Sequence, residues 1–162
     1  MVLIGLPKFR NEKIITNQNT QDIVKLILLT EKKNRNTAKK ISKLFKGDNN
    51  FETCKKIFDY LKRNFKYEKE SEEQQTTKSL ERFIFDKKGD CKHFAIFVIS
   101  ILNALNIPCF FRLISQNYYS KLPKHIYAVA LINGNEIIID AVTDNFNCEP
   151  AYKYKFDVEP LK

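Results

Sequence analysis

An almost entirely apolar segment from Phe94 to Leu105 constrains the fold of this chain more than any other feature. Ten of its 12 residues are apolar, and only Ser100 and Asn103 interrupt the run. The segment is far too short to span a membrane, so a helix of this composition has to be buried in protein on nearly every side. Asn106-Ile107-Pro108 then ends the helix, because Asn tolerates the left-handed conformation of a helix stop. We therefore expect the rest of the chain to pack around this helix.

The residues before the apolar run place a cysteine in the first turn of the helix. Gly89 interrupts the regular structure, Asp90 is a suitable N-cap, and Cys91 begins the helix that runs to Leu105. The free N–H groups of a first helical turn stabilise a thiolate, which is the reactive form of cysteine. Cys91 is therefore a candidate nucleophile. A lone cysteine is also commonly a buried structural residue, and that alternative stays open.

A nucleophilic cysteine requires a general base from another part of the fold. His93 lies two positions after Cys91 on the same helix, which turns its side chain about 200° away. His125 is the only other histidine, and it precedes a segment of apolar and β-branched residues. We therefore expect His125 to be the base, although a histidine at a strand end is also commonly a plain surface residue.

Asp140 is a candidate partner for His125 because of the hairpin that separates them. Asn133-Gly134 is the sequence of a tight two-residue turn. Pairing Ile132 with Asn135 across this turn puts Asp140 on the same face as His125, offset by two positions and within reach of a long side chain. A carboxylate there can orient the imidazole and fix its tautomer. The alternative is that Asp140 only ends the strand.

The hydrophobic pattern places helices first and strands last, which predicts an α+β fold with the helices packed on a small antiparallel sheet. Residues 1–19 are expected to be extended or irregular, and the charged residues 68–78 to form a surface loop. The expected helices run from Thr20 or Gln21 to about Lys33, from Thr37 to Lys46, from Phe51 to Phe65 and from Leu80 to Phe85. The expected strands are Cys109–Ser115, Ile126–Ile132 and Glu136–Val142.

The other three cysteines are expected to be structural. Cys54 lies on the apolar stripe of its helix, and Cys109 and Cys148 have no visible base. No Cys-x-x-Cys pair occurs and there are two histidines, so neither a metal nor a cofactor is expected. The apolar opening from Val2 to Pro7 is too short for a signal peptide and lacks a basic lead. We therefore expect reduced thiols in a cytoplasmic protein without a membrane segment.

The chain length fits one domain, 1–162, made of a helical part (1–79), the core motifs (80–144) and a C-terminal tail (145–162). The chain has 28 Lys and Arg against 19 Asp and Glu, for a net charge of +9. Most of this excess lies in residues 1–80, which carry 18 basic and 10 acidic side chains. Such a surface can face an acidic protein partner, but lysines spread over helices are also typical of a solvated face. Nucleic-acid binding is disfavoured because no known module accompanies the charge.

Four short motifs follow one another along the chain: Gly89-Asp90-Cys91 with Ala95, Asn106-Ile107-Pro108, His125-Ile126-Tyr127 and Ile138-Ile139-Asp140. In this order they resemble the transglutaminase-like superfamily. The resemblance covers about Leu80 to Asp144 and implies a papain-like fold with Cys91 as nucleophile, His125 as general base and acid, and Asp140 as the orienting carboxylate. Lys92 stands where crosslinking transglutaminases carry a tryptophan, and no acidic cluster suits calcium. The resemblance therefore implies a microbial or phage member of the wider superfamily.

These residues together predict a thiol-dependent enzyme, a cysteine peptidase or amidase that hydrolyses a peptide or protein amide. The backbone N–H of Cys91 is the default oxyanion donor. Gln116 is a second candidate donor, although a polar residue at a strand end is an equal alternative, and Tyr127 is a candidate substrate contact. The competing hypothesis is a non-catalytic structural or adaptor protein of a phage virion or larger assembly. Such a protein would keep the fold and use the basic N-terminal half for docking.

Overall fold

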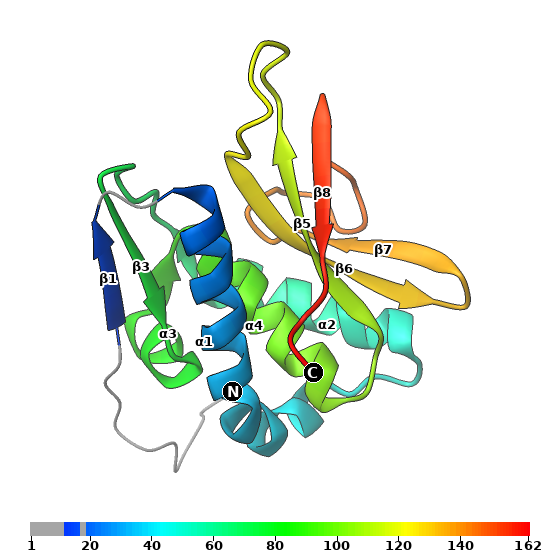
Figure 1. Cartoon of the computed structure of the whole chain (residues 1–162). Coiled ribbons are helices and arrows are strands. Elements are labelled where there is room, and N and C mark those ends of the chain that lie inside the picture. Colours follow the sequence, from blue (N-terminus) through cyan, green and yellow to red (C-terminus); the bar gives the residue numbers. More distant parts are fainter. Residues whose placement is uncertain (1–11, 17–18) are drawn as a thin grey trace.

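The apolar helix is the centre of the fold. In the computed structural model, which describes residues 12–16 and 19–162, it forms α4 (Cys91–Ala104). Every residue from Lys92 to Leu102 is buried. Helix α4 packs against α1 (Thr20–Ile41) and α2 (Asn50–Asn64) and against the main sheet (Figure 1). The predicted burial is confirmed, and so is the helix stop, because Asn106 has a φ of 57°.

A four-stranded antiparallel sheet covers one side of α4, which confirms the α+β fold. Its strand order is β7-β6-β5-β8, formed by β5 (Cys109–Ser115), β6 (His125–Ile132), β7 (Asn135–Ile139) and β8 (Tyr154–Val158). Asn133 and Gly134 turn the hairpin with φ values of 52° and 79°. Ile132 pairs with Asn135, so the hairpin register is the predicted one.

Strand β8 lies in the segment that the sequence analysis took for a C-terminal tail. It pairs with β5 along five residues, from Ser115 with Tyr154 to Phe111 with Val158. Tyr154, Phe156 and Val158 alternate with charged residues, so the signal of a strand with one apolar face was present in the sequence. The tail prediction for 145–162 is therefore wrong for these five residues.

The N-terminal helices differ from the prediction in one respect. The two helices expected on either side of residues 34–36 are one continuous helix, α1, followed by a short 3-10 turn, η1 (Ser42–Phe45). No Gly or Pro interrupts the segment, and Arg35 pairs with the buried Glu31 one turn earlier at 3.1 Å. Asn34 is also buried, and its Oδ1 accepts the N–H of Leu80. The polar residues near 34–36 therefore do not interrupt the helix, because Glu31 and Asn34 are buried and have hydrogen-bonding partners.

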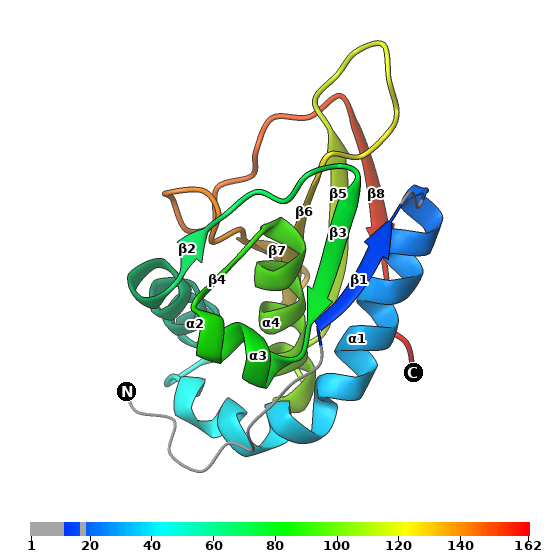
Figure 2. The ribbon, with the colours of Figure 1, turned by 90° about the vertical axis from the view of Figure 1, so that its left-hand side faces the viewer.

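The charged residues 68–78 do not form only a loop. Strand β3 (Gln74–Lys78) pairs with β1 (Glu12–Thr16), which lies in the segment expected to be extended or irregular. Strand β3 is polar, yet Thr76 and Thr77 are buried. Thr76 is held by hydrogen bonds to Glu70, so a hydrophobic pattern could not identify this strand. Figure 1 shows the β1–β3 ribbon on the side of α4 opposite the main sheet, and Figure 2 shows this ribbon facing the viewer.

The remaining helices follow the prediction. Asn49 caps α2 by accepting the N–H of Glu52, and Cys54 is buried on its inner face, as expected. Helix α3 (Leu80–Asp86) buries Phe83 against the core. Two short strands, β2 (Lys66–Tyr67) and β4 (Lys88–Gly89), pair in parallel just before α4. Among the described residues, none of the helices is long and apolar enough to cross a membrane.

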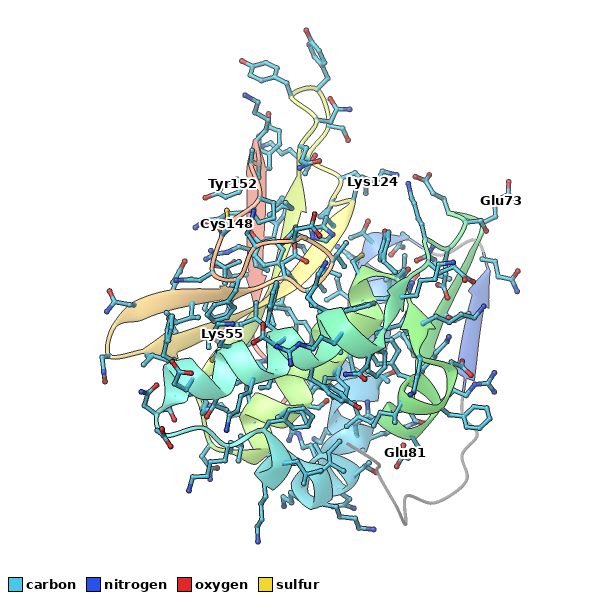
Figure 3. The ribbon with its side chains drawn as sticks, turned by 180° about the vertical axis from the view of Figure 1, so that it is seen from behind. Lys55, Glu73, Glu81, Lys124, Cys148 and Tyr152 are labelled. Atoms are coloured by element: carbon cyan, nitrogen blue, oxygen red, sulfur yellow. The ribbon has the colours of Figure 1, made fainter. Side chains whose placement is uncertain are left out.

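A second, smaller core lies on the face of the sheet that points away from α4. It contains Phe110, Ile114, Tyr127, Val129 and Ile138. The segment after β7 lies over this face, and Figure 3 shows Cys148 and Tyr152 on it. The guanidinium of Arg112, which is fully buried, pairs with Glu136, Glu149 and Asp157. These ion pairs tie β5, β7, β8 and the covering segment together.

Replacing Arg112 by Met should destabilise the protein by about 2 kcal/mol at neutral pH, because three carboxylates lose their cation but remain partly hydrated. The hydrogen bond from Arg112 lowers the pKa of Glu136. A lowered carboxyl pKa adds stability above the unfolded pKa of about 4.3 and loses it as pH falls. Urea unfolding should therefore show that the difference in the free energy of unfolding between wild type and variant becomes smaller below about pH 4. Arg63→Met, on an exposed face of α2, should change stability by less than about 0.5 kcal/mol; an equal loss would contradict this account.

Candidate active site

The turn into α4 fixes the position of Cys91. Asp90 caps the helix by accepting the N–H of Lys92 at 3.2 Å, and its own N–H is donated to Nδ1 of His93 at 3.0 Å. A Cβ on Gly89 would lie 2.8 Å from that same nitrogen, so only glycine fits beside the His93 ring. The Gly-Asp-Cys motif thus builds a rigid helix start, with His93 as a structural residue and Cys91 at the first helical position.

Cys91 is half-buried and faces a cleft of about 620 Å³. One wall is the beginning of α1, with Ile23 and Val24, and the opposite wall is formed by Leu113 and by residues 122–126. Lys124 pairs at 2.7 Å with Glu72 and joins the loop before β6 to the loop before β3. Figure 3 labels Lys124 and the neighbouring Glu73 on these two loops.

His125 and Asp140 are in direct contact beside Cys91. Nε2 of His125 lies 2.6 Å from Oδ2 of Asp140, whose side chain is almost completely buried. Oδ1 of Asp140 accepts the N–H of Val142, which fixes the carboxylate plane. His125 and Cys91 line the same cleft, and the proximity of Cys91 contributes to the raised pKa of the imidazole. The structure therefore brings together the three residues that the sequence analysis selected, with His125 between the other two.

The electrostatics of the cleft favour a charged imidazole. Burial acts to lower the pKa of His125, but hydrogen bonds to Asp140 and Cys91 outweigh burial and raise the pKa from 6.5 to about 10. His125 is therefore cationic at neutral pH beside a sulfur atom at a helix start. An imidazolium and a helix N-terminus both favour a thiolate over a thiol.

The other cysteines lack these features. Burial raises the pKa of Cys54 to about 12. Burial also raises the pKa of Cys109, whose Sγ donates to Oδ1 of Asn103 at 3.4 Å. Cys148 is exposed on the segment that covers the outer face of the sheet. Among the four cysteines, all within the described residues, Cys91 is the one that lines a cleft together with a histidine.

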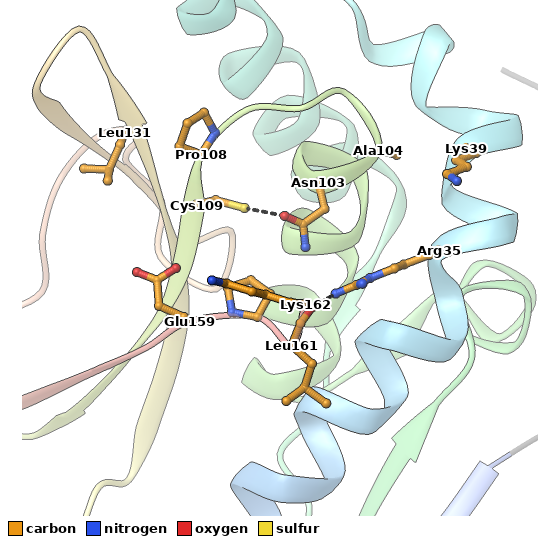
Figure 4. Close-up of a pocket in the computed structure, with 11 residues that line it drawn as sticks. Arg35, Lys39, Asn103, Ala104, Pro108, Cys109, Leu131, Glu159, Leu161 and Lys162 are labelled. Atoms are coloured by element: carbon orange, nitrogen blue, oxygen red, sulfur yellow. Dashed lines mark hydrogen bonds between the residues drawn. The ribbon is translucent and has the colours of Figure 1, made fainter.

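A second cavity, of about 730 Å³, lies near the end of the chain (Figure 4). It is lined by Arg35, Lys39, Asn103, Cys109 and residues 159–162, together with a few apolar side chains. No histidine belongs to this lining in the described part of the chain, and the Cys109 thiol donates a hydrogen bond to Asn103. The cavity is slightly larger than the cleft at Cys91 but lacks the groups for acyl chemistry.

Lys92, which occupies the place of a tryptophan in crosslinking transglutaminases, is buried beside the cleft. Its ammonium group contacts Oδ2 of Asp90, Oε2 of Glu70 at 2.7 Å and Oε1 of Gln75 at 2.9 Å. These contacts tie the helix start to the loop before β3. Glu70, Asp90 and His93 together could offer ligand atoms to a metal ion, since these atoms lie within 4.8 Å of one another. The ammonium of Lys92 contacts both Glu70 and Asp90 and supplies one positive charge to this pair of carboxylates.

Gln116 and Tyr127 lie apart from the cleft lining. The amide of Gln116 is exposed and donates to the carbonyl of Ala151 at 3.1 Å. Tyr127 is buried on the outer side of the sheet, where its hydroxyl donates to Glu149 at 2.9 Å. Its ring lies 5.6 Å from the ring of His125 and so supports it from behind. The predicted roles of Gln116 and Tyr127 toward substrate stay predictions.

Tyr67 is a cleft residue that the sequence analysis missed. It lies on β2, pairs with Gly89 of β4 and lines the cleft. Burial raises the pKa of Tyr67, and the nearby charges of Cys91, Asp90 and Asp140 raise it further. Nothing in the local sequence marks this tyrosine, because its proximity to Cys91 arises from the pairing of two very short strands.

Comparisons with known proteins identify the family and the fold. Residues 35–135 match the family described as the transglutaminase-like superfamily. The structure is similar to the "putative cysteine protease" of Cytophaga hutchinsonii, with a TM-score of 0.51 and 23% identity over 80% of this chain and 48% of that one. It is also similar to the "putative protease" of Parabacteroides distasonis, with a TM-score of 0.53 and 15% identity over 71% of this chain and 26% of that one.

This chain thus spans about half or less of the length of these two proteins, and likeness at such low identity concerns the fold alone. No curated protein matches the sequence. The family match covers well over half of the 162 residues and includes Cys91 and His125, whereas Asp140 lies just beyond it. The chain belongs to the transglutaminase-like superfamily.

Proposed function

We propose that this protein is a cysteine-dependent acyl-transfer enzyme, a peptidase or amidase that hydrolyses an amide of a peptide or protein. The observation that carries the proposal is that a cysteine at a helix start shares one cleft with an imidazole that contacts a buried carboxylate. We further propose that residues 1–162 act as one domain, because α1 lines the cleft and β8 completes the sheet.

In the proposed reaction, the thiolate of Cys91 attacks the carbonyl carbon of the amide and forms a tetrahedral intermediate. The imidazolium of His125 gives its proton to the leaving amine, the C–N bond breaks, and a thioester forms on Cys91. Neutral His125 then removes a proton from water, which attacks the thioester. The carboxylic acid product leaves, and the thiolate and imidazolium are restored. Asp140 keeps the ring oriented and stabilises its positive charge throughout.

Two groups are available to stabilise the negative oxygen of the tetrahedral intermediate. The backbone N–H of Cys91 is at the first helical position, where it has no acceptor within the helix. The hydroxyl of Tyr67 is the second candidate. Tyr67 lines the cleft, and its proximity to Cys91 contributes to its raised pKa. A donor aimed at the developing charge typically contributes about a hundredfold to the rate.

Hydrolysis is favoured over transfer to an amine for two reasons. Leu122 and Lys124, which line the cleft, are exposed, so water has access to a thioester on Cys91. The two structurally similar proteins also carry protease names, which supports a peptidase as the proposed activity.

The first test of the proposal is acylation by p-nitrophenyl acetate, which requires no knowledge of the natural substrate. We expect a burst of nitrophenolate and one acetyl group on Cys91, located by peptide mapping, followed by slow hydrolysis. Asp140→Asn should slow turnover about a hundredfold or more, because the imidazole loses its orienting carboxylate.

Asp144→Asn is the matched control for this test. Asp144 is almost fully exposed and pairs with Lys62 on the surface, so its loss should leave turnover within about twofold. Equal losses of turnover from Asp140→Asn and Asp144→Asn would contradict the proposal, and so would acetylation of Cys148 in preference to Cys91.

Thiol reactivity provides an independent prediction. Iodoacetamide at about pH 6 should alkylate Cys91 faster than Cys54, Cys109 and Cys148, because an unperturbed thiol with a pKa of about 8.5 is almost wholly protonated there. His125→Ala should slow labelling of Cys91 about tenfold or more, since the thiolate loses its cation, and should leave the exposed Cys148 unchanged. Labelling of Cys91 no faster than that of the buried Cys109 in the native protein would favour a structural role instead.

A further inference from the structure

The loop between β5 and β6, residues 116–124, carries an unusual set of exposed side chains next to the cleft. It rises beyond the end of the sheet in both ribbon views (Figures 1 and 2). Tyr119 is 95% exposed, Tyr118 67% and Leu122 48%. Large apolar side chains gathered in this way commonly mark an interaction surface.

Hydrogen bonds hold this loop in a defined shape. Oγ of Ser115 donates to the carbonyl of Ser120 at 2.6 Å, and Oδ1 of Asn117 accepts the N–H of Tyr119 at 2.9 Å. The hydroxyl of Tyr154 on β8 donates to the carbonyl of Tyr118 at 3.1 Å. The exposed rings are therefore presented in a fixed arrangement, which lowers the entropy cost of binding.

The same surface is positively charged. The ammonium of Lys121 lies 5.4 Å from the ring centre of Tyr154, and that of Lys153 lies 5.9 Å from the ring centre of Tyr118. Within the described residues, neither lysine forms an ion pair with a carboxylate, in contrast to Lys124, which is paired with Glu72. Two cations thus remain available to an acidic partner, spaced by aromatic rings.

This surface is continuous with the cleft. Leu113 lines the cleft, and its partner across the β5–β8 pair is Phe156, which is 43% exposed. Tyr154 lies two residues from Phe156 and so on the same face of the sheet. Leu122 lines the cleft directly. We name this region the arm surface; it consists of Tyr118, Lys121, Leu122, Lys153, Tyr154 and Phe156.

We propose that the arm surface binds an acidic segment of the polypeptide whose amide is held at Cys91. The inference rests on the proposed function and adds a substrate class to it. The lysines attract carboxylates, and the rings pack against the extended chain between them. Lysines and tyrosines can also bind single-stranded nucleic acid. A polypeptide is the better occupant because the surface leads into a cleft built for acyl chemistry, so one chain can occupy both.

The test uses tethered electrophiles, which report docking without requiring hydrolysis. Two peptides carry an N-terminal chloroacetyl group followed by alternating glutamate and glycine, or by alternating glutamine and glycine. A third probe is chloroacetyl-tagged single-stranded DNA. The rate of alkylation of Cys91 is measured by peptide mapping at low salt, with iodoacetamide as the untethered reference. We expect the glutamate peptide to react about tenfold faster than the glutamine peptide, and the advantage to disappear at about 1 M salt.

Variants locate the effect on the arm surface. Lys121→Glu with Lys153→Glu should abolish the advantage of the glutamate peptide, and the milder Lys121→Gln with Lys153→Gln should reduce it, while iodoacetamide labelling of Cys91 stays unchanged in both. The matched control is Lys39→Glu with Lys40→Glu, two exposed lysines on α1, which should have no effect. Neither Lys121 nor Lys153 lines the cleft, so the thiol itself is not perturbed.

Equal rates for the two peptides, an equal loss in the control variant, or a larger acceleration by the DNA probe would overturn the docking proposal. A failure of the proposed function is distinguishable from these outcomes. It would appear as slow labelling of Cys91 by iodoacetamide and as the absence of an acetyl-enzyme, whatever the peptide sequence.

Discussion

The burial of α4 is the constraint on which the rest of the structure depends. Helix α4 is packed against helices α1 and α2 and strands β5 and β6, and its residues from Lys92 to Leu102 are buried. Each fully buried Ile, Leu or Phe contributes about 1.5–3 kcal/mol, so this one helix accounts for a large share of the hydrophobic stabilisation. The helix cannot shift without exposing that surface. Its first residue, Cys91, is therefore held at one position near the start of β6.

The second constraint is the charge of Asp140. A carboxylate that is almost completely buried requires a cationic or hydrogen-bonding partner, and His125 supplies it at 2.6 Å. The contact raises the pKa of His125, against the effect of burial, and so keeps an imidazolium beside Cys91 at neutral pH. The same interaction that satisfies a buried charge thus provides the cation that a reactive thiolate needs. On the outer side of the sheet, Tyr127 packs against the His125 ring and connects it through Glu149 to Arg112.

Local signals in the sequence were sufficient to predict that Cys91, His125 and Asp140 lie together, because each signal depends on a few neighbouring residues. Asn133-Gly134 determines the hairpin register and hence places Asp140 diagonally across from His125, offset by two positions, and Gly89-Asp90 determines the start of α4. The signals were insufficient where a contact joins distant segments. The polar strand β3 is stabilised by Glu70 and by pairing with β1, α1 continues through buried partners of Asn34 and Glu31, and Tyr67 reaches Cys91 only through the β2–β4 pair. No periodicity in the sequence encodes those contacts.

The central claim is that His125 is an imidazolium held between Cys91 and Asp140 in the resting protein. Nitrogen NMR of the two histidine rings measures this directly, because protonated and neutral imidazole nitrogens have different chemical shifts. At pH 7 both ring nitrogens of His125 should be protonated. The pKa of His125 measured by titration should fall in Cys91→Ser, which removes the sulfur atom, and fall further when Asp140→Asn is added. A neutral His125 ring at pH 7 in the wild-type protein, with a pKa close to the usual value of about 6.5, would contradict the account.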